Sequence, residues 1–334
     1  MAERDPFFDS LKFVLILFVV FGHTMEYHIH FSTYHIESAA YTFMYTFNMP
    51  LFVFVSGYFS KNVTWSRYKP KFWGLVMSYI VFQTILFIPY IVNGTFSLRY
   101  YLFYPQKVMW YIPALLVWRF TFCFIPKLKL SFPVIFIISL ILSLLIGYQY
   151  HPSPLFYAPS KILVFLPYFI LGYYCPKKSI EKIRKMDKEF SVAIIVVIIG
   201  LIYTTMPSQQ AISFYGTIPY TQLFPGEETL GLVCRLSTYI ISIIVSCAII
   251  SLVTTKLAKW GDRTLDIYLL HAPLVYLVYV KLIETYHWNT NIFIDFIVFL
   301  IIIFICLFLS KQKIIQYLIN PITIFQKNKS TIKS

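Results

Sequence analysis

The feature that most constrains this chain is a series of apolar runs, each about twenty residues long. A helix of roughly 17–25 mainly apolar residues is long enough to cross the hydrocarbon core of a bilayer. The chain is 58% hydrophobic and only 13% charged, so it has too few polar side chains to cover a water-facing surface. We therefore predict an all-α integral membrane protein, one bundle of about ten transmembrane helices in the lipid bilayer. The expected spans are residues 8–27, 41–60, 72–92, 108–126, 131–148, 160–175, 190–207, 229–253, 264–282 and 291–310.

The distribution of basic residues predicts how the bundle is oriented. Of the 28 Lys and Arg residues, 21 lie in the N-terminal segment, in the loops 61–71, 127–129, 177–188 and 256–263, and after residue 310. Three others, Arg99, Lys107 and Lys161, lie at or near the opposite ends of the spans. An excess of Lys and Arg marks cytoplasmic loops, so both termini are expected inside, which requires an even number of spans. The same scatter argues against a nucleic-acid partner, although the net charge is +14.

We expect two parts in the chain: a transmembrane domain over residues 1–310 and a basic cytoplasmic tail over residues 311–334. The first span carries the clearest functional signal, because ionisable residues inside membrane spans are costly and usually mark a functional site. Lys12 and His23 are eleven positions apart, which places them within about 20° of one helix face and roughly 16 Å apart along the axis. Asp9 precedes Lys12 by one turn and Glu26 follows His23 by one turn, so all four share a stripe. The alternative is that Lys12 only snorkels to the membrane surface and His23 bonds a neighbouring helix.

Five segments resemble one known family when they are taken together. The first has Arg4, Asp9, a basic residue at Lys12 and a Gly-His pair that ends at His23; the others are residues 48–58, 110–116, 165–173 and 261–273. In this order they resemble the membrane-bound acyltransferase family 3, O-acyltransferases that modify bacterial surface polysaccharides. One departure is Lys12, where the family often has Arg; a lysine keeps the positive charge but offers no bidentate fork.

The resemblance implies a multi-pass enzyme of the bacterial cell (inner) membrane, a transferase of acyl groups other than aminoacyl groups. It would transfer an acyl group, such as acetyl, from cytoplasmic acyl-CoA to a hydroxyl of an extracytoplasmic or lipid-linked glycan. Acetyl-CoA or another acyl-CoA is then a co-substrate, and no permanently bound cofactor is expected. Polysaccharide biosynthesis proteins are further expected partners.

Acyl transfer to a hydroxyl needs a base for the hydroxyl proton or a nucleophile that carries the acyl group. His23 can serve as either, and Glu26 can orient its imidazole; in the family this role falls on the histidine that matches His23. Coenzyme A carries several phosphate charges, which basic groups near the cytoplasmic mouth can bind. The candidate donor-binding residues are Arg4, Asp9, Lys12, Arg67, Lys69 and Lys71. The basic loop is explained equally well by membrane topology alone.

Further polar residues inside the spans are candidates for lining the same interior site: Asn48, Ser56, Trp110, Arg119, Arg235 and His271. Asn48 lies just before Pro50, where the helix is expected to kink or open. Arg119 and Arg235 could each bind an oxyanion or form a structural ion pair with a carboxylate. For His271 a structural role is expected, because a single histidine on an apolar helix can simply bond a neighbour.

Two features of the outer loops leave alternatives open. His28, His30 and His35 follow the first span, but they lack the i, i+4 spacing and any cysteine partner, so we expect no metal site. The loop 208–228 is rich in amide and aromatic residues, which suits either a sugar acceptor surface or an interfacial aromatic belt. Its members are Gln209, Gln210, Phe214, Tyr215, Tyr220, Gln222, Glu227 and Glu228.

Intramembrane charges also occur in transporters and flippases, which provide the alternative function. Transporters tend to have repeated halves with paired broken helices, and the second half of this chain has no counterpart of the Asn-Met-Pro segment. A third hypothesis is a catalytically inactive membrane partner of a polysaccharide synthase. The presence of both His23 and Glu26 argues against it.

Overall fold

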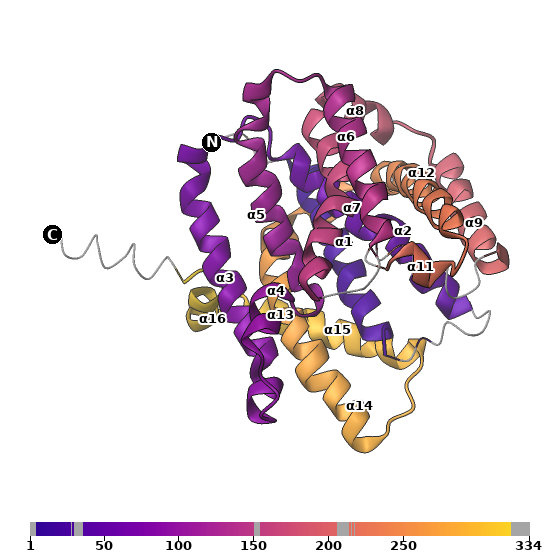
Figure 1. Ribbon diagram of the computed structural model, residues 1–334. Helices are drawn as coiled ribbons and strands as arrows, with labels where there is room; N and C mark the ends of the chain where they lie inside the picture. Colours follow the sequence, from indigo (N-terminus) through magenta and orange to yellow (C-terminus); the bar gives the residue numbers. More distant parts are fainter. Residues whose placement is uncertain are drawn as a thin grey trace. The chain divides into compact units, whose positions relative to one another are not determined.

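We describe the protein from a computed structural model over residues 5–27, 29, 36–149, 154–205, 214, 216 and 218–321. Every regular element in these ranges is helical (Figure 1). Six stretches are long and apolar enough to cross a membrane: Pro6–Met25, Trp65–Val92, Lys107–Leu128, Glu228–Leu252, Thr255–Tyr286 and Ile292–Leu309. A seventh candidate is the pair Ala158–Tyr174 and Lys177–Arg184, whose axes are bent by 98°.

The structure confirms the prediction of an all-helical, multi-span membrane protein. Each of the ten ranges expected from the sequence overlaps a helix. The number of ten crossings and the orientation with both termini inside stay predictions.

The chain divides into two compact units. The first comprises Met1–Lys61 and Leu130–Asp262, and the second comprises Asn62–Lys129 and Arg263–Ser334. The main helices of the first unit are α1 (Pro6–Met25), α2 (Ile36–Tyr58), α6 (Phe132–Leu145), α7 (Pro154–Tyr174), α8 (Lys177–Arg184), α9 (Lys188–Thr205), α11 (Tyr220–Leu223) and α12 (Glu228–Leu252).

Helix α1 has a well-defined start. Asp5 is its N-cap and accepts a hydrogen bond from the Phe7 backbone N–H at 3.0 Å, and Pro6 takes the first helical position. A carboxylate cap satisfies an otherwise unpaired N–H, and proline loses nothing there because its missing N–H would have no partner. The start of α1 is therefore fixed, and with it the register of the ionisable residues that follow.

Two glycines allow α2 and α7 to pack closely. A Cβ added at Gly57 would overlap the carbonyl group of Phe169, and one added at Gly172 would overlap the carbonyl group of Phe54. Small residues at such crossings are the usual means of bringing two membrane helices into close contact. Helix α2 continues through Pro50 to Tyr58, so it does not open at this proline, and the alternative expectation of a kink there stays a prediction.

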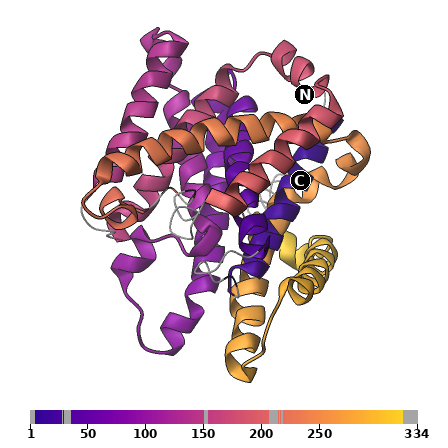
Figure 2. The same ribbon diagram turned by 90° about the vertical axis from the view of Figure 1, so that its right-hand side faces the viewer.

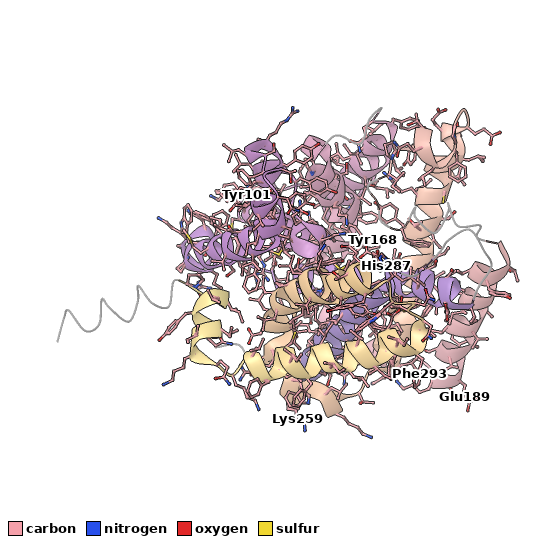
Figure 3. All side chains as sticks on the ribbon, turned by 90° about the horizontal axis from the view of Figure 1, so that it is seen from below. Tyr101, Tyr168, Glu189, Lys259, His287 and Phe293 are labelled. Atoms are coloured by element: carbon pink, nitrogen blue, oxygen red, sulfur yellow. The ribbon has the colours of Figure 1, made fainter. Side chains whose placement is uncertain are left out.

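Helices α9 and α12 lie side by side (Figures 1 and 2). Ser251 donates a hydrogen bond to the hydroxyl of Ser191 at 2.6 Å across this pair, and Figure 3 marks Glu189 at the first turn of α9. Between these helices, α1, α2 and α8 lies an apolar core that contains Leu15, Phe47 and Ile180. The interior of the first unit is thus built by the helices that also carry His23 and Asn48.

The second unit contains α3 (Trp65–Val92), α4 (Leu98–Phe103), α5 (Tyr111–Phe122), α13 (Thr264–Pro273), α14 (Val280–Tyr286), α15 (Ile292–Leu309) and α16 (Lys313–Ile319). The predicted span 264–282 is not one regular α-helix, because a π-helical segment, Leu274–Tyr279, joins α13 to α14. The expected tail is partly structured: α16 packs on α3, where Ser78 donates a hydrogen bond to the carbonyl of Ile319.

Candidate active site

The imidazole of His23 and the carboxylate of Glu26 are in contact at the C-terminal end of α1. His23 Nδ1 lies 3.2 Å from Glu26 Oε2. Both side chains are partly accessible, with 19% of His23 and 35% of Glu26 exposed. A carboxylate at Nδ1 favours the tautomer with the proton on that nitrogen, which makes Nε2 the basic nitrogen of the ring. The arrangement can therefore accept a proton from a hydroxyl, or carry an acyl group, at Nε2.

The second pair on α1 joins Lys12 to Asp9. Lys12 Nζ lies 2.8 Å from Asp9 Oδ1, and the Asp9 side chain is buried while that of Lys12 is partly exposed. A carboxylate repels phosphate, so Asp9 in this geometry fixes the position of the Lys12 ammonium rather than binding an anion itself. The residues of the predicted stripe thus form two separate contacts: the Asp9–Lys12 ion pair near the start of the helix and the His23–Glu26 pair at its end.

The segment Thr255–Arg263 packs against the first turns of α1. The backbone N–H of Leu257 donates to Ser10 Oγ at 3.1 Å, and Gly261 lies so close to the backbone of Asp9 that an added Cβ would be 2.6 Å from its Cα. Only glycine fits at this distance. The glycine that opens the motif at 261–273 therefore allows a close contact beside the Asp9–Lys12 pair.

Asn48 braces the middle of α1 from α2. With its amide oriented to satisfy both partners, it donates to the Leu15 carbonyl and accepts from the Val19 N–H, each at 3.0 Å. A side chain that bonds the backbone of a neighbouring helix fixes both its rotation and its depth. Asn48 was predicted to line the site, and its contact lies one to two turns before His23.

Lys161 is a residue whose importance the sequence did not reveal. Its position at the start of a predicted span suggested an outer-end lysine, but in α7 its side chain is 7% exposed and interacts electrostatically with Glu26. Burying a charged lysine is costly, and a nearby carboxylate lowers that cost. The one sequence signal that could have identified Lys161 is that a charged residue within an apolar segment is costly.

Arg235 and Ser56 are held by backbone carbonyls. The guanidinium of Arg235 donates to Ser143 O at 3.0 Å and to Ile218 O at 3.3 Å, and it lies 4.8 Å from the centre of the Tyr220 ring. Ser56 Oγ donates to Phe52 O at 3.0 Å within its own helix. The described contacts of Arg235 favour the structural reading of this residue, because they hold the segment before α11 against α6.

Two aromatic side chains in the described part of the loop 208–228 are buried. Tyr220 is fully buried against Gly147 and Gly231, where its O–H donates to Leu144 O at 3.1 Å, and Phe214 is also buried. These two rings therefore contribute to packing and do not form an exposed acceptor surface, whereas Gln222 is exposed. Gln209, Gln210 and Tyr215 lie outside the described residues.

The remaining candidates belong to the second unit. Arg67, Lys69 and Lys71 are exposed in the first turns of α3, where the 100° helical step puts Arg67 and Lys71 on one face and Lys69 on the other. Arg119 of α5 lies 5.9 Å from the centre of the Tyr68 ring.

Trp110 and His271 are both buried in this unit. His271 Nδ1 lies 2.9 Å from Ile267 O on its own helix, and the neighbouring Tyr268 donates a hydrogen bond to Val108 O. The rings of Tyr111 and Tyr268 also pack with their centres 5.6 Å apart, so the family-like segments at 110–116 and 261–273 are in direct contact. The predicted donor-binding set is divided between the two units, and Arg4 lies outside the described residues. So do His28, His30 and His35, so the expectation of no metal site stays a prediction.

The protein has several membrane-spanning helices, a His–Glu pair and a buried lysine. Such residues within a helical bundle are typical of membrane proteins that carry out proton-transfer or group-transfer chemistry. Comparison with family models makes the assignment specific. The model described as "Acyltransferase domain" matches residues 5–311, and this chain therefore belongs to the acyltransferase 3 family. A search of curated proteins and a search of solved structures gave no significant match.

The family assignment confirms that the protein is a membrane-bound, acyl-transferring enzyme that uses an acyl donor. It decides between the two main functional expectations in favour of the acyltransferase over the transporter. The matched range begins at the cap of α1 and ends after α15, so it includes His23, Glu26 and the Asp9–Lys12 pair.

Proposed function

We propose that this enzyme is an O-acyltransferase that moves an acyl group, acetyl in the simplest case, from cytoplasmic acyl-CoA to a hydroxyl of a glycan. The acceptor is an extracytoplasmic or lipid-linked sugar, and the enzyme lies in a bacterial inner membrane with ten spans and both termini inside. The observation that carries the proposal is the contact between His23 Nδ1 and Glu26 Oε2 at 3.2 Å, on a helix inside the family's matched region.

The reaction assigned to His23 is proton removal at Nε2. The acceptor hydroxyl oxygen attacks the acyl carbon and its proton passes to Nε2. The carbon–sulfur bond of the thioester then breaks, and Nε2 gives the proton to the leaving sulfur, so coenzyme A is released as the thiol. Glu26 stabilises the imidazolium that forms, because its negative charge lies at Nδ1. If Nε2 instead attacks the acyl carbon first, the carbon–sulfur bond breaks and coenzyme A leaves as the thiolate. In a second step the acceptor hydroxyl attacks the carbonyl carbon of the acyl group, the carbon–Nε2 bond breaks, and the hydroxyl proton passes to the freed Nε2.

Asp9 and Lys12 are assigned to the acyl donor. Lys12 lies eleven residues before His23, so its ammonium is placed to meet a phosphate of the donor nearer the other end of α1. Asp9, at 2.8 Å, keeps the ammonium in place when no donor is bound. This assignment gives a role to two charged residues on the first turns of an apolar helix, where charge is costly.

The direct test of this function is transfer of label. Membranes that contain the enzyme are incubated with acetyl-CoA labelled in the acetyl group, and the glycan fraction is analysed by mass spectrometry. We expect acetyl groups on sugar hydroxyls, and the matching mass increment on surface glycan only in cells that carry the gene. Label on no glycan, with every acyl-CoA chain length tried, would contradict the proposed acceptor.

A further inference from the structure

The first unit contains a mainly apolar cavity of about 480 Å³ between α2, α6, α7, α8 and α12. This volume falls in the range of roughly 300–1,000 Å³ that is typical of small-molecule sites. Tyr168, marked in Figure 3, is part of its wall. Six further wall residues show its apolar character and the helices that form it: Phe54, Phe132, Leu171, Ile183, Ile243 and Ser246.

One wall of this cavity is formed by an amphipathic basic helix. Helix α8 is bent by 98° from α7, and it buries Ile180 while Ile183 contributes to the cavity wall. Lys182 and Arg184 are exposed, and each lies 100° around the helix from Ile183, on opposite sides. Residues 177–189 hold six basic and three acidic residues, so this end of the cavity carries a net charge of +3.

A further cation is fixed at the same end. Cys175 contributes to the cavity wall, and its carbonyl accepts a hydrogen bond from the ammonium of Lys61. The ammonium also lies 3.7 Å from the centre of the Tyr58 ring. Cationic side chains from two segments distant in sequence, residue 61 and helix α8, therefore lie next to an apolar chamber.

The cavity is separate from the proposed catalytic histidine. None of its wall residues belongs to α1, and the neighbouring Arg184 lies 4.1 Å from the ring of Phe7, on the first turn of α1. His23 is sixteen residues further along that helix, or roughly 24 Å at 1.5 Å per residue. The cavity is therefore not a pocket for the acyl group at His23.

We propose that this cavity is a binding site for one anionic glycerophospholipid. An acyl chain of the lipid occupies the apolar chamber, and its phosphate contacts Lys61 and Arg184, while Lys182 on the other side of α8 adds to the local positive charge. The charge pattern selects this occupant, because basic pockets between membrane helices attract anionic head groups and apolar walls match an acyl chain. An amphipathic helix placed across the end of a span is also suited to the depth of the head groups.

The test measures binding of defined lipids to the whole enzyme in detergent, by native mass spectrometry and by the shift in unfolding temperature. The probes are phosphatidylglycerol, phosphatidylcholine with the same chains, and inorganic phosphate. We expect phosphatidylglycerol to bind more tightly than phosphatidylcholine and to raise the unfolding temperature, and phosphate alone to do neither. Equal binding of the two lipids, or an equal shift with phosphate, would overturn the proposal.

Variants separate the two halves of the site. Lys182→Gln/Arg184→Gln changes two exposed side chains and should weaken phosphatidylglycerol binding about 30-fold, which corresponds to roughly 1 kcal/mol for each basic residue. Its matched control is Lys256→Gln/Lys259→Gln, two exposed lysines of the same unit outside the cavity, which should leave the lipid preference unchanged. Equal effects of the two double variants would refute a specific head-group site.

Ser246→Trp fills the chamber and should abolish retention of the lipid, whereas Ile240→Trp changes an exposed position of the same helix outside the cavity and should not. Full lipid retention in Ser246→Trp would refute the chamber as the acyl-chain site. If this variant does not fold, the charge variants decide the question. The lipid proposal is judged by lipid binding alone, whereas the proposed function is judged by acyl transfer. A negative result for one therefore does not count against the other.

Discussion

At the scale of single residues, Glu26 is expected to act through His23 rather than on the substrate. Its carboxylate contacts Nδ1 at 3.2 Å, so replacing it by Gln keeps the shape of the side chain but removes the charge that stabilises the imidazolium. We predict that Glu26→Gln lowers kcat by at least about tenfold, while Glu26→Asp, which keeps the charge, retains more activity. Steady-state acyl transfer in purified enzyme measures both. Similar rates for Gln and Asp variants would show that the charge at this position has no role.

Lys12 is predicted to act on the acyl donor. Lys12→Ala should raise KM for acyl-CoA about 10- to 100-fold, the equivalent of the roughly 1.5–3 kcal/mol of a hydrogen bond to a charged group. Lys12→Arg keeps the charge and adds a fork that can bind phosphate with two hydrogen bonds, so it should retain activity or increase it. Titration of the donor at fixed acceptor separates KM from kcat. An alanine variant with unchanged donor KM would remove Lys12 from the binding site.

The single residues also show where the sequence was informative and where it was not. The spacing placed Asp9 and Glu26 each one turn from a basic residue, and the structure shows both contacts, because a regular helix fixes which residues are neighbours one turn apart. The carbonyl partners of Arg235 and the burial of Lys161 beside Glu26 depend on which helices become neighbours. A sequence without an alignment carries no signal for such contacts between distant segments.

At the scale of helices, the close crossing of α2 and α7 depends on Gly57 and Gly172. We predict that Gly172→Ala destabilises the enzyme by about 1–3 kcal/mol, since its methyl group would overlap the Phe54 carbonyl. Gly200→Ala on α9 is the matched control: apart from the backbone of its own helix, no atom of the described residues lies within 4 Å of the added Cβ, and alanine favours a helix by up to about 1 kcal/mol. Thermal unfolding in detergent compares the two. Equal unfolding temperatures for both variants would show that the crossing tolerates a side chain.

The helices themselves were largely predictable, because an apolar run of about twenty residues has few alternatives in a bilayer. All ten expected ranges overlap helices, but local departures were not foreseen. Helix α2 runs through Pro50, the segment Leu274–Tyr279 is π-helical, and the basic stretch at 177–184 is an amphipathic helix rather than a loop. These departures depend on packing between helices and on the free energy of placing a basic helix at the membrane–water interface. Hydropathy along the sequence reports neither of these.

At the scale of the whole molecule, the basic residues predict that Ser66 is cytoplasmic and Gln222 is outside. Both side chains are exposed, so each can be replaced by cysteine in a variant that lacks the five native cysteines. An impermeant thiol reagent applied to intact cells should label Gln222→Cys and leave Ser66→Cys unlabelled until the cells are opened. The reverse pattern would overturn the predicted orientation with both termini inside.

The central claim is that His23 performs the chemistry, and His23→Ala tests it most directly. Removing a structural hydrogen bond within a membrane bundle costs roughly 0.6–2 kcal/mol, which changes stability and not chemistry. Removing a general base lowers the rate by roughly 10²- to 10⁴-fold, and loss of a covalent carrier lowers it further. Transfer of labelled acyl groups is therefore measured alongside the unfolding temperature for wild type and His23→Ala. We predict a folded, membrane-inserted variant with transfer reduced at least about 100-fold; near-normal turnover in a well-folded variant would contradict an active site on α1.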